Sequence, residues 1–155
     1  MLEPASAVAL SIGLAKVCFN ISLWIKRIRN VDGAVAALGQ DVERLKPILE
    51  SVGHLASTSN DLPTVLHENR VKKHWESIEI LLGECKATLE KLDYIFRRLD
   101  KKRDWKIWKE VRRQWDNDDI TQYRHQVSEC RDGIQLNLLM INVYDLCCLK
   151  NDFLL

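Results

Sequence analysis

The sequence lacks an excess of charge of either sign, and it lacks the short motifs that carry most enzyme chemistry. Its 23 Lys and Arg residues nearly balance its 22 Asp and Glu residues, for a formal net charge of +1 at pH 7. Such a balance creates no overall field that would attract nucleic acid. The patterns HExxH, GxGxxG, GxSxG and CxxC and the Walker motif are all missing. The sequence therefore predicts a protein that is not an enzyme, uses no cofactor and binds no nucleic acid.

The four histidines do not show the spacing of a metal site. His67 and His74 are seven residues apart on one expected helix, which separates them by two turns and is too far for one metal ion. His54 and His125 stand far from both in the sequence. No Glu-x-x-His pair of the kind found in di-iron helical bundles occurs. We therefore expect no metal site.

The five cysteines are odd in number and lack the spacing of a redox or zinc motif. Cys85 and Cys130 fall on apolar helical stripes, where a reduced cysteine behaves as a small hydrophobic residue. We therefore expect all five thiols, including Cys18, to be unpaired, and we expect a reducing, cytoplasmic environment. The adjacent Cys147 and Cys148 leave two interpretations open. They are palmitoylated or bind a metal, or they are two thiols at the edge of the core.

Apolar residues, by contrast, recur with helical spacing through the whole chain. The most apolar of the expected helices is the N-terminal one. A helix is expected over about 5–28, opened by Pro4, whose fixed φ suits the first helical turn. Its main apolar stripe recurs at steps of four and three and comprises Leu10, Leu14, Val17, Ile21, Trp24 and Ile28. A weaker second stripe comprises Ile12, Phe19 and Leu23. A helix that is apolar nearly all round lies at the centre of a bundle or enters lipid.

This N-terminal helix does not resemble a secretory signal, and it is marginal as a permanent membrane span. Glu3 stands where a signal has basic residues, and the apolar run continues into Lys26 instead of a cleavage site. A span needs roughly 20 apolar residues. Lys16, Asn20 and Ser22 interrupt the run.

Three further helices are expected over about 32–53, 64–99 and 119–150. Asp32 is the expected N-cap of the first and Thr64 of the second, and Gly53 together with the polar run Ser57–Asp61 is expected to end the first. Pro47 lies inside the first of these helices, but the apolar seam continues through it in phase. The three seams are Val35, Leu38, Val42, Leu45, Leu49 and Val52; Val71, Trp75, Ile78, Leu82, Cys85, Leu89, Leu92, Phe96 and Leu99; and Ile120, Tyr123, Val127, Cys130, Ile134, Leu138, Ile141 and Tyr144.

A basic segment with several tryptophans, residues 97–115, separates the last two long helices. It holds nine Lys or Arg and three Asp or Glu residues, a local charge of +6. Trp108, Val111 and Trp115 share one face of a short amphipathic helix over about 104–115. Such a helix is either a connecting arm whose indoles cover the core, or an element that binds a membrane surface or an anionic partner. The acidic residues Asp116, Asp118 and Asp119 follow it, which suggests local neutralisation.

These patterns predict one all-α domain over 1–155, an antiparallel helical bundle of four main helices plus the short basic connecting helix. No strand pattern competes with the helical one at any position. Three long apolar seams in a chain of 155 residues need neighbours that cover them, and a bundle provides such neighbours.

The order of these segments resembles a known group of domains. The relevant stretches read EPASAVALSIGLA, KRIRNVDGAVAALGQDVERLKPILESV, RDWKIWKEVRRQW and ITQYRHQVSECRDGIQLNLLMI. They are similar to the N-terminal helical domains of fungal NLR-like signal-transduction NTPases and ankyrin-repeat proteins, the HeLo-like group that includes the azaphilone-cluster N-terminal domain. The resemblance implies a bundle related to those of fungal heterokaryon-incompatibility proteins and of the mixed-lineage kinase-like pseudokinase. It also implies a nucleotide-binding or repeat region beyond Leu155.

The resemblance implies a function in programmed cell death. In this group the first helix is proposed to leave the bundle and insert into membrane once the domain is clustered. The residues that this implies for insertion here are Leu10, Gly13, Leu14, Val17, Ile21 and Trp24. The basic residues expected at an anionic plasma-membrane surface, or on a partner, are Lys26, Arg27, Arg29, Lys101, Lys102, Arg103, Lys106, Lys109, Arg112 and Arg113. The alternative is a bundle for self-association or protein–protein interaction that never enters lipid.

Overall fold

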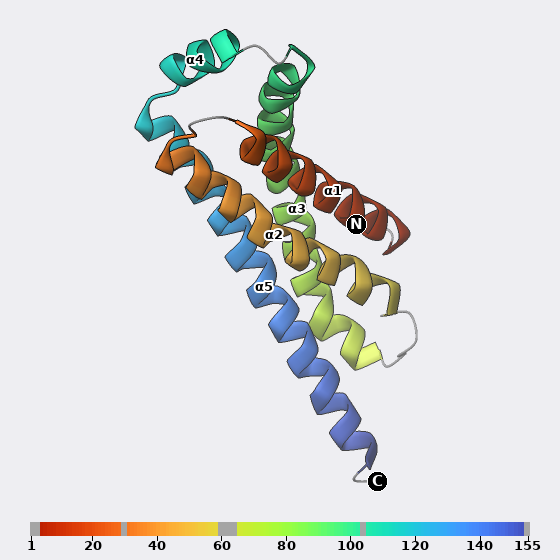
Figure 1. Ribbon diagram of the computed structural model, residues 1–155. Helices are drawn as coiled ribbons and strands as arrows, with labels where there is room; N and C mark the ends of the chain where they lie inside the picture. The colour runs from red at the N-terminus through yellow and green to blue at the C-terminus, as the bar shows by residue number, and fades with distance from the viewer. Residues whose placement is uncertain (1–3, 29–30, 59–64, 103–104, 154–155) are drawn as a thin grey trace.

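Five helices make up the chain over residues 4–28, 31–58, 65–102 and 105–153, the part that a computed structural model describes. In chain order they are α1 (Pro4–Arg27), α2 (Gly33–Thr58), α3 (Val65–Lys102), α4 (Trp105–Gln114) and α5 (Asn117–Phe153) (Figure 1). No strand occurs within these residues, so the predicted all-α fold is confirmed. The expected ranges agree with the observed helices to within a few residues, except at the end of α2.

The starts of α2 and α5 are held by aspartates that cap the first helical turn. The Val35 amide donates to Asp32 Oδ1 at 2.9 Å, as predicted for an N-cap. At α5, the Asp119 amide donates to Asp116 Oδ1 at 2.8 Å and the Asp116 amide donates to Asp119 Oδ2 at 3.1 Å. This reciprocal arrangement satisfies two amides that the helix itself leaves unbonded. The expected cap at Thr64 lies outside the described residues.

The predicted end of α2 at Gly53 is wrong, because the helix continues to Thr58, inside the polar run that was also expected to end it. Gly53 is buried against α1, where an added Cβ would lie 3.6 Å from Ile12 Cγ1. Its lack of a side chain therefore serves the close approach of two helices and does not terminate one. Pro47 lies inside the same helix, at an exposed position, so the helix passes through the residue as the continuous seam indicated.

The helices form two antiparallel hairpins, α1 with α2 and α3 with α5. Lys26 of α1 pairs with Glu43 of α2, and Phe19 earlier in α1 lies under Lys46 later in α2. The two helices therefore run in opposite directions. The second hairpin shows the same reversal. His74 bonds Asn137, and Thr88 bonds Gln126.

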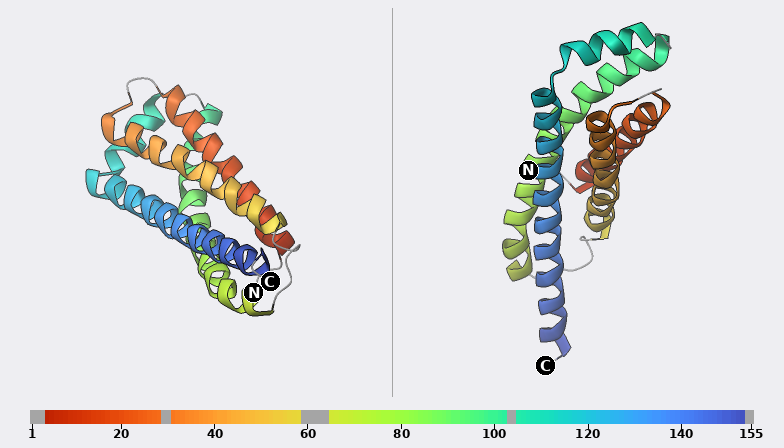
Figure 2. Two further views of the ribbon diagram at one scale, coloured as in Figure 1. Left: turned by 90° about the horizontal axis from the view of Figure 1, so that it is seen from below. Right: turned by 60° about the vertical axis from the view of Figure 1, so that its left-hand side comes forward.

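The two hairpins pack so that α2 lies beside α5 and α1 lies beside α3, while α1 and α5 are not in contact (Figure 2). Arg112 bonds both Asp32 at the start of α2 and Asn117 at the start of α5, and Asp41 further along α2 pairs with Arg124 further along α5. Thus α2 and α5 run in the same direction. Antiparallel packing therefore applies within each hairpin and not between them, which departs from the predicted wholly antiparallel arrangement.

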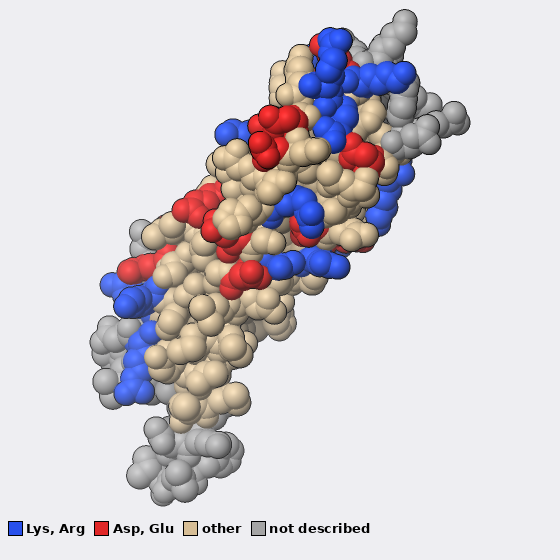
Figure 3. All heavy atoms as spheres, turned by 90° about the vertical axis from the view of Figure 1, so that its left-hand side faces the viewer, with Lys and Arg blue, Asp and Glu red and all other residues tan. Residues whose placement is uncertain are grey.

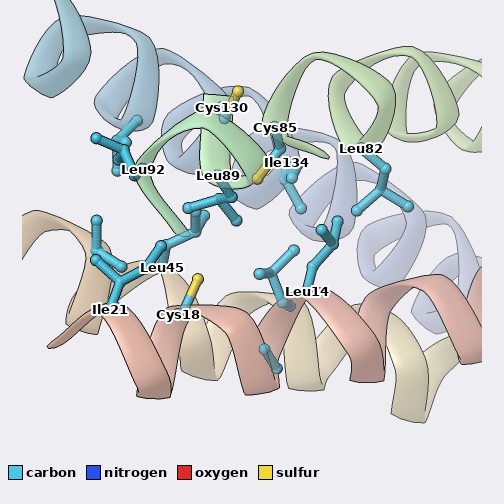
Figure 4. Close-up of a cluster of buried hydrophobic side chains, with 14 of the residues drawn as sticks. Leu14, Cys18, Ile21, Leu45, Leu82, Cys85, Leu89, Leu92, Cys130 and Ile134 are labelled. Atoms are coloured by element: carbon cyan, nitrogen blue, oxygen red, sulfur yellow. The ribbon is translucent and has the colours of Figure 1, made fainter. Parts of the chain in front are cut away.

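The core lies where the two hairpins face each other. Side chains of α1, including Cys18 and Ile21, point toward Leu89 and Leu92 of α3, and Ile134 of α5 lies beside them (Figure 4). All five are buried. The seams predicted for α2, α3 and α5 supply most of the other core residues, which confirms the assignment of their inward faces. The largest fully buried side chains are Phe96, Ile21, Leu38, Leu45, Leu49, Ile78, Leu82, Leu89, Leu92, Ile120, Ile134 and Ile141.

Candidate interaction surfaces

The stripe of α1 that was predicted to insert into membrane faces the inside of the bundle. Leu14 and Ile21 are buried, and Leu10, Val17 and Trp24 are partly buried against the core. Gly13 alone of the six is exposed, with no atom within 4 Å of a Cβ placed there. In the folded bundle these residues therefore do not form one accessible surface.

The outer side of α1 carries the weaker second stripe. Ile12 is 58% exposed and Phe19 is 51% exposed. The ammonium of Lys46 lies 5.3 Å from the centre of the Phe19 ring, within the range of a cation–π contact. By length and composition alone, Ser6–Arg27 is long and apolar enough to cross a membrane. In the bundle, 39% of its most apolar part is buried. The helix is thus at the edge of the bundle and not at its centre.

The basic residues at the end of α1 are accessible. Lys26 Nζ lies 3.1 Å from Glu43 Oε1 in an exposed ion pair, and Arg27 is also exposed. An exposed pair of this kind contributes at most about 1 kcal/mol and is weakened by salt. Lys26 can therefore exchange its partner for an anionic group at little cost. Arg29 lies outside the described residues.

In the basic segment, Arg112 is a structural residue and not part of an open surface, which corrects its assignment to the basic face. Its guanidinium bonds the Asp32 carboxylate, the Trp115 carbonyl oxygen at 2.7 Å and Asn117 Oδ1 at 3.1 Å. It thereby ties the end of α4 to the starts of α2 and α5. Arg113 pairs within α4, with Glu110 at 2.7 Å, and it remains exposed.

Of the other basic residues predicted for this surface, Lys109 is exposed at its described position in α4. Arg103 lies outside the described residues, as do the side chains of Lys101, Lys102 and Lys106. Among the residues predicted for the basic surface of this segment, Lys109 and Arg113 are therefore the two whose side chains are described and exposed. Asp116 and Asp119, two of the acids that follow it, accept hydrogen bonds from each other's backbone amides.

Two indoles of the basic segment, those of Trp108 and Trp115, cover the core, as the connecting-arm interpretation predicted. Trp108 is buried and its ring stacks on Phe96 at a centroid distance of 6.2 Å. Trp115 meets Phe96 edge-on at 6.1 Å and Tyr123 at 5.4 Å. Aromatic contacts of this geometry add stabilisation beyond the burial of their area. These two tryptophans therefore belong to the fold and are not available for lipid or nucleobases.

The pKa of Asp32 reflects its position at this junction. Burial of the carboxyl by itself would raise the pKa, but the Val35 amide and the Arg112 guanidinium favour the ionised form and outweigh burial. The result is a pKa below the ordinary value of an aspartate. Asp32 therefore stays ionised while it caps α2 and holds α4.

A second ion pair joins the two hairpins at a more buried position. Arg124 Nε donates to Asp41 Oδ2 at 2.7 Å, and the Asp41 side chain is only 8% exposed. A partly buried carboxylate without its partner is costly. Sequence reasoning missed this pair, because Asp41 and Arg124 lie 83 residues apart in the chain and each reads as an ordinary polar helix position.

The described cysteines are all free, as predicted, but they differ in their surroundings. Cys18, Cys85 and Cys130 are buried. Burial raises the pKa of the Cys18 thiol to about 12, and a hydrogen bond with Cys130 together with burial raises the pKa of the Cys85 thiol. Cys147 is exposed, so it is not a thiol of the core edge, and the side chain of Cys148 lies outside the described part. Among the described residues no group of His, Cys, Asp and Glu could hold a metal ion.

The largest group of exposed apolar side chains lies on the C-terminal half of α5, and sequence reasoning did not identify it. Leu136, Leu139, Val143 and Leu146 are 60%, 58%, 42% and 63% exposed. Their spacing of three, four and three residues places them on one helix face, opposite the buried Ile134 and Ile141. Figure 3, which views the bundle from the α5 side, shows an uncharged area directly above the grey C-terminal residues. We call these four residues the outer face of α5.

No known protein family, curated protein or solved structure matches the chain significantly. What this protein does has therefore to be inferred from the surfaces described above.

Proposed function

We propose that this protein is a non-catalytic, membrane-associating effector bundle of the kind that executes cell death when clustered. One observation carries the proposal: the most apolar helix of the described chain, α1, lies at the edge of the bundle, with part of its apolar surface already in solvent. Ile12 and Phe19 provide that exposed surface, and Lys26 and Arg27 follow at the end of the same helix.

In this proposal the exposed surface of α1 makes the first contact with lipid, and insertion follows only after clustering. Insertion would have to remove Leu14, Cys18, Ile21 and Ile25 from the core, where all four are buried. Exposing one large apolar side chain to water costs about 1.5–3 kcal/mol of the free energy gained by its burial. The isolated bundle is therefore expected to bind membrane weakly, and neighbouring copies must offset the cost of opening.

The basic residues supply recruitment in this proposal. A Lys or Arg near an anionic surface contributes about 1 kcal/mol. Lys26, Arg27, Lys109 and Arg113 are exposed and can serve, and Arg29, Lys101, Lys102, Arg103 and Lys106 complete the proposed set. Arg112 is left out because of its bonds to the fold. Recruitment of this kind is electrostatic and must weaken as salt rises.

Binding to vesicles of anionic lipid, and leakage from them, test the proposal. Ile12→Glu with Phe19→Glu places charge on the outer side of α1 and should abolish leakage and weaken binding. Ile80→Glu on α3, an equally exposed position at 65%, is the matched control and should behave like wild type. Both changes are at exposed positions, so the helical signal should be unchanged in each. Leakage by the double variant at the wild-type level would refute the role of α1.

A second pair of variants tests recruitment. Lys101→Glu with Lys102→Glu should weaken vesicle binding sharply, and added salt should weaken wild-type binding in the same way. Neither change removes apolar surface, so the melting temperature should be unaffected. Tight binding at high salt, or no binding to anionic vesicles at low salt, would contradict the proposed recruitment.

The outer face of α5 favours a second candidate function, a protein–protein interaction bundle that stays in water. This face is complete in the folded state, and exposing it requires no opening of the core. If vesicles are neither bound nor made leaky while the protein still associates through α5, this second function is the one that remains.

A further inference from the structure

We propose that the outer face of α5 pairs with the same face of a second copy, with the two helices antiparallel about a two-fold axis near Ile141. This pairing would supply the contact through which copies cluster in the proposed function. Only its biological role rests on that function. The contact itself needs no lipid.

The first argument is the spacing of the face. Leu136, Leu139, Val143 and Leu146 repeat at three, four and three residues, which is the a/d pattern of a helix that packs along another helix. The residues that flank this seam are all uncharged: Gln135, Met140, Asn142 and Cys147. Asp145 lies away from the seam and is half-buried. The face therefore has the composition of a buried helix–helix contact, although in the described part of the chain its four residues are exposed.

The second argument is that the seam is complementary to itself. With a two-fold axis at the level of Ile141, Leu136 of one copy lies opposite Leu146 of the other, and Leu139 lies opposite Val143. Each layer thus pairs an a position with a d position, as antiparallel coiled coils do. A two-fold contact of this kind uses the same patch on both copies and closes at a dimer.

The third argument is charge. In the sequence Asp132 precedes the seam by four residues and Lys150 follows it by four, so the same axis places them opposite each other. Asp132 is exposed and also accepts a bond from the neighbouring Arg131 at 3.2 Å. In the antiparallel dimer an Asp position therefore opposes a Lys position at each end of the apolar layers, whereas a parallel dimer would set Asp against Asp and Lys against Lys. The charges therefore select the antiparallel orientation.

The size of the contact makes it a weak one. The 19 residues from Asp132 to Lys150 span about 28 Å of helix, and a single helix pair of that length falls in the class of small, transient interfaces below about 1,200 Å². The dimer should thus dissociate on dilution. Such a contact forms when other forces concentrate the protein, which is what a clustering step requires.

Sedimentation of the full chain in lipid-free buffer, over a wide range of concentrations, tests the pairing. Wild type should shift from monomer toward dimer as concentration rises. Leu139→Lys with Leu146→Lys should weaken this association at least tenfold, whereas Ile80→Lys, at a position equally exposed on α3, should leave it unchanged. Circular dichroism should show the same helix content for all three proteins. A chain that stays monomeric throughout, or a dimer indifferent to the α5 variant, overturns the proposal.

Charge exchange tests the orientation. Asp132→Lys alone should weaken association, because it sets Lys against Lys150 of the partner copy, and Lys150→Asp alone should weaken it equally. Both changes together should restore it, because opposite charges face each other again. A double variant as weak as either single variant excludes the antiparallel arrangement. A dimer without vesicle leakage would refute the membrane function and leave this pairing intact. Leakage without a dimer would refute the pairing and leave the membrane function intact.

Discussion

The two most apolar stretches of this protein, α1 and the C-terminal half of α5, are used in opposite ways. In α1 the main apolar stripe, with Leu14 and Ile21, is buried in the core. Its outer side carries both apolar and charged residues, because the exposed Lys16 lies between Ile12 and Phe19. In α5 the core takes one stripe, and a second, uninterrupted stripe from Leu136 to Leu146 is left over.

This difference shows that the hydropathy of a helix does not identify the surface it offers to others. The main apolar stripe of α1 faces the core, so lipid can reach Leu14 and Ile21 only if the bundle opens, although Ile12 and Phe19 on the outer side are already exposed. The surplus on α5 is available without any rearrangement. Opening and pairing are thus separate properties of the molecule, located on helices that do not touch each other.

The sharpest way to test this contrast is to shorten side chains inside and outside the bundle. Leu82→Ala and Leu89→Ala, at fully buried positions, should each lower the free energy of unfolding by about 2–5 kcal/mol. Leu136→Ala and Leu139→Ala, on the outer face of α5, should each change it by no more than about 0.5 kcal/mol. Urea denaturation of dilute protein measures both. Equal losses at the two kinds of site would mean that the inner and outer faces of these helices are misassigned.

A smaller effect is expected where the two hairpins and α4 meet. Asp32→Ala removes an N-cap, which typically costs about 0.5–2 kcal/mol, together with the Arg112 partner. The loss should appear in thermal unfolding. Asp41→Asn, which removes the charge of the other link between the hairpins, offers a comparison at a more buried site. An unchanged melting temperature in Asp32→Ala would show that this junction does not hold the bundle together.

The same residue predicts a pH dependence with a definite sign. The pKa of Asp32 is lowered in the folded protein, whereas in the unfolded chain it is about 3.9. Its contribution is therefore complete above that unfolded value and is lost as the pH falls through the lower folded value. In Asp32→Asn this component of acid destabilisation should vanish, which a series of melting temperatures between neutral and acid pH can measure. A variant with the same acid profile as wild type would contradict the assignment.

No effect at all is expected from reduction of the thiols. The described cysteines are unpaired, so a reducing agent should leave the melting temperature unchanged. A fall of several degrees would reveal a disulfide and would contradict the prediction that the thiols are unpaired.

The helices could be predicted from the sequence because their seams are long and regular, while the surfaces could not. Leu82 and Leu89 were assigned inward by spacing alone, since no other stripe of α3 competes with theirs. The seam of α5 was also assigned inward correctly, at Ile134 and Ile141. Its second apolar stripe was not recognised as a surface, because only the packing of α5 beside α2 and α3 leaves that stripe exposed.

Long-range partners left no local signal either. Asp41 and Arg124 meet because the hairpins are placed with α2 beside α5, and nothing near either residue predicts this. Gly53 was misread for a related reason, since a glycine that ends a helix and one that admits a neighbouring helix look alike in a sequence. The indoles of Trp108 and Trp115 fitted both alternatives for the basic segment until their contacts with Phe96 were known.

The links between the hairpins also bear on how the protein opens. Helices α1 and α2 make their most extensive contact with each other, and α2 is joined to the rest by the ion pairs of Asp32 and Asp41. Because cooperative units of a protein often coincide with such supersecondary pieces, α1 and α2 should lose amide protection against hydrogen exchange together, ahead of α3 and α5. The α3–α5 hairpin can then persist as a folded remainder while the N-terminal hairpin swings free, so release of the first helix need not pass through the unfolded state.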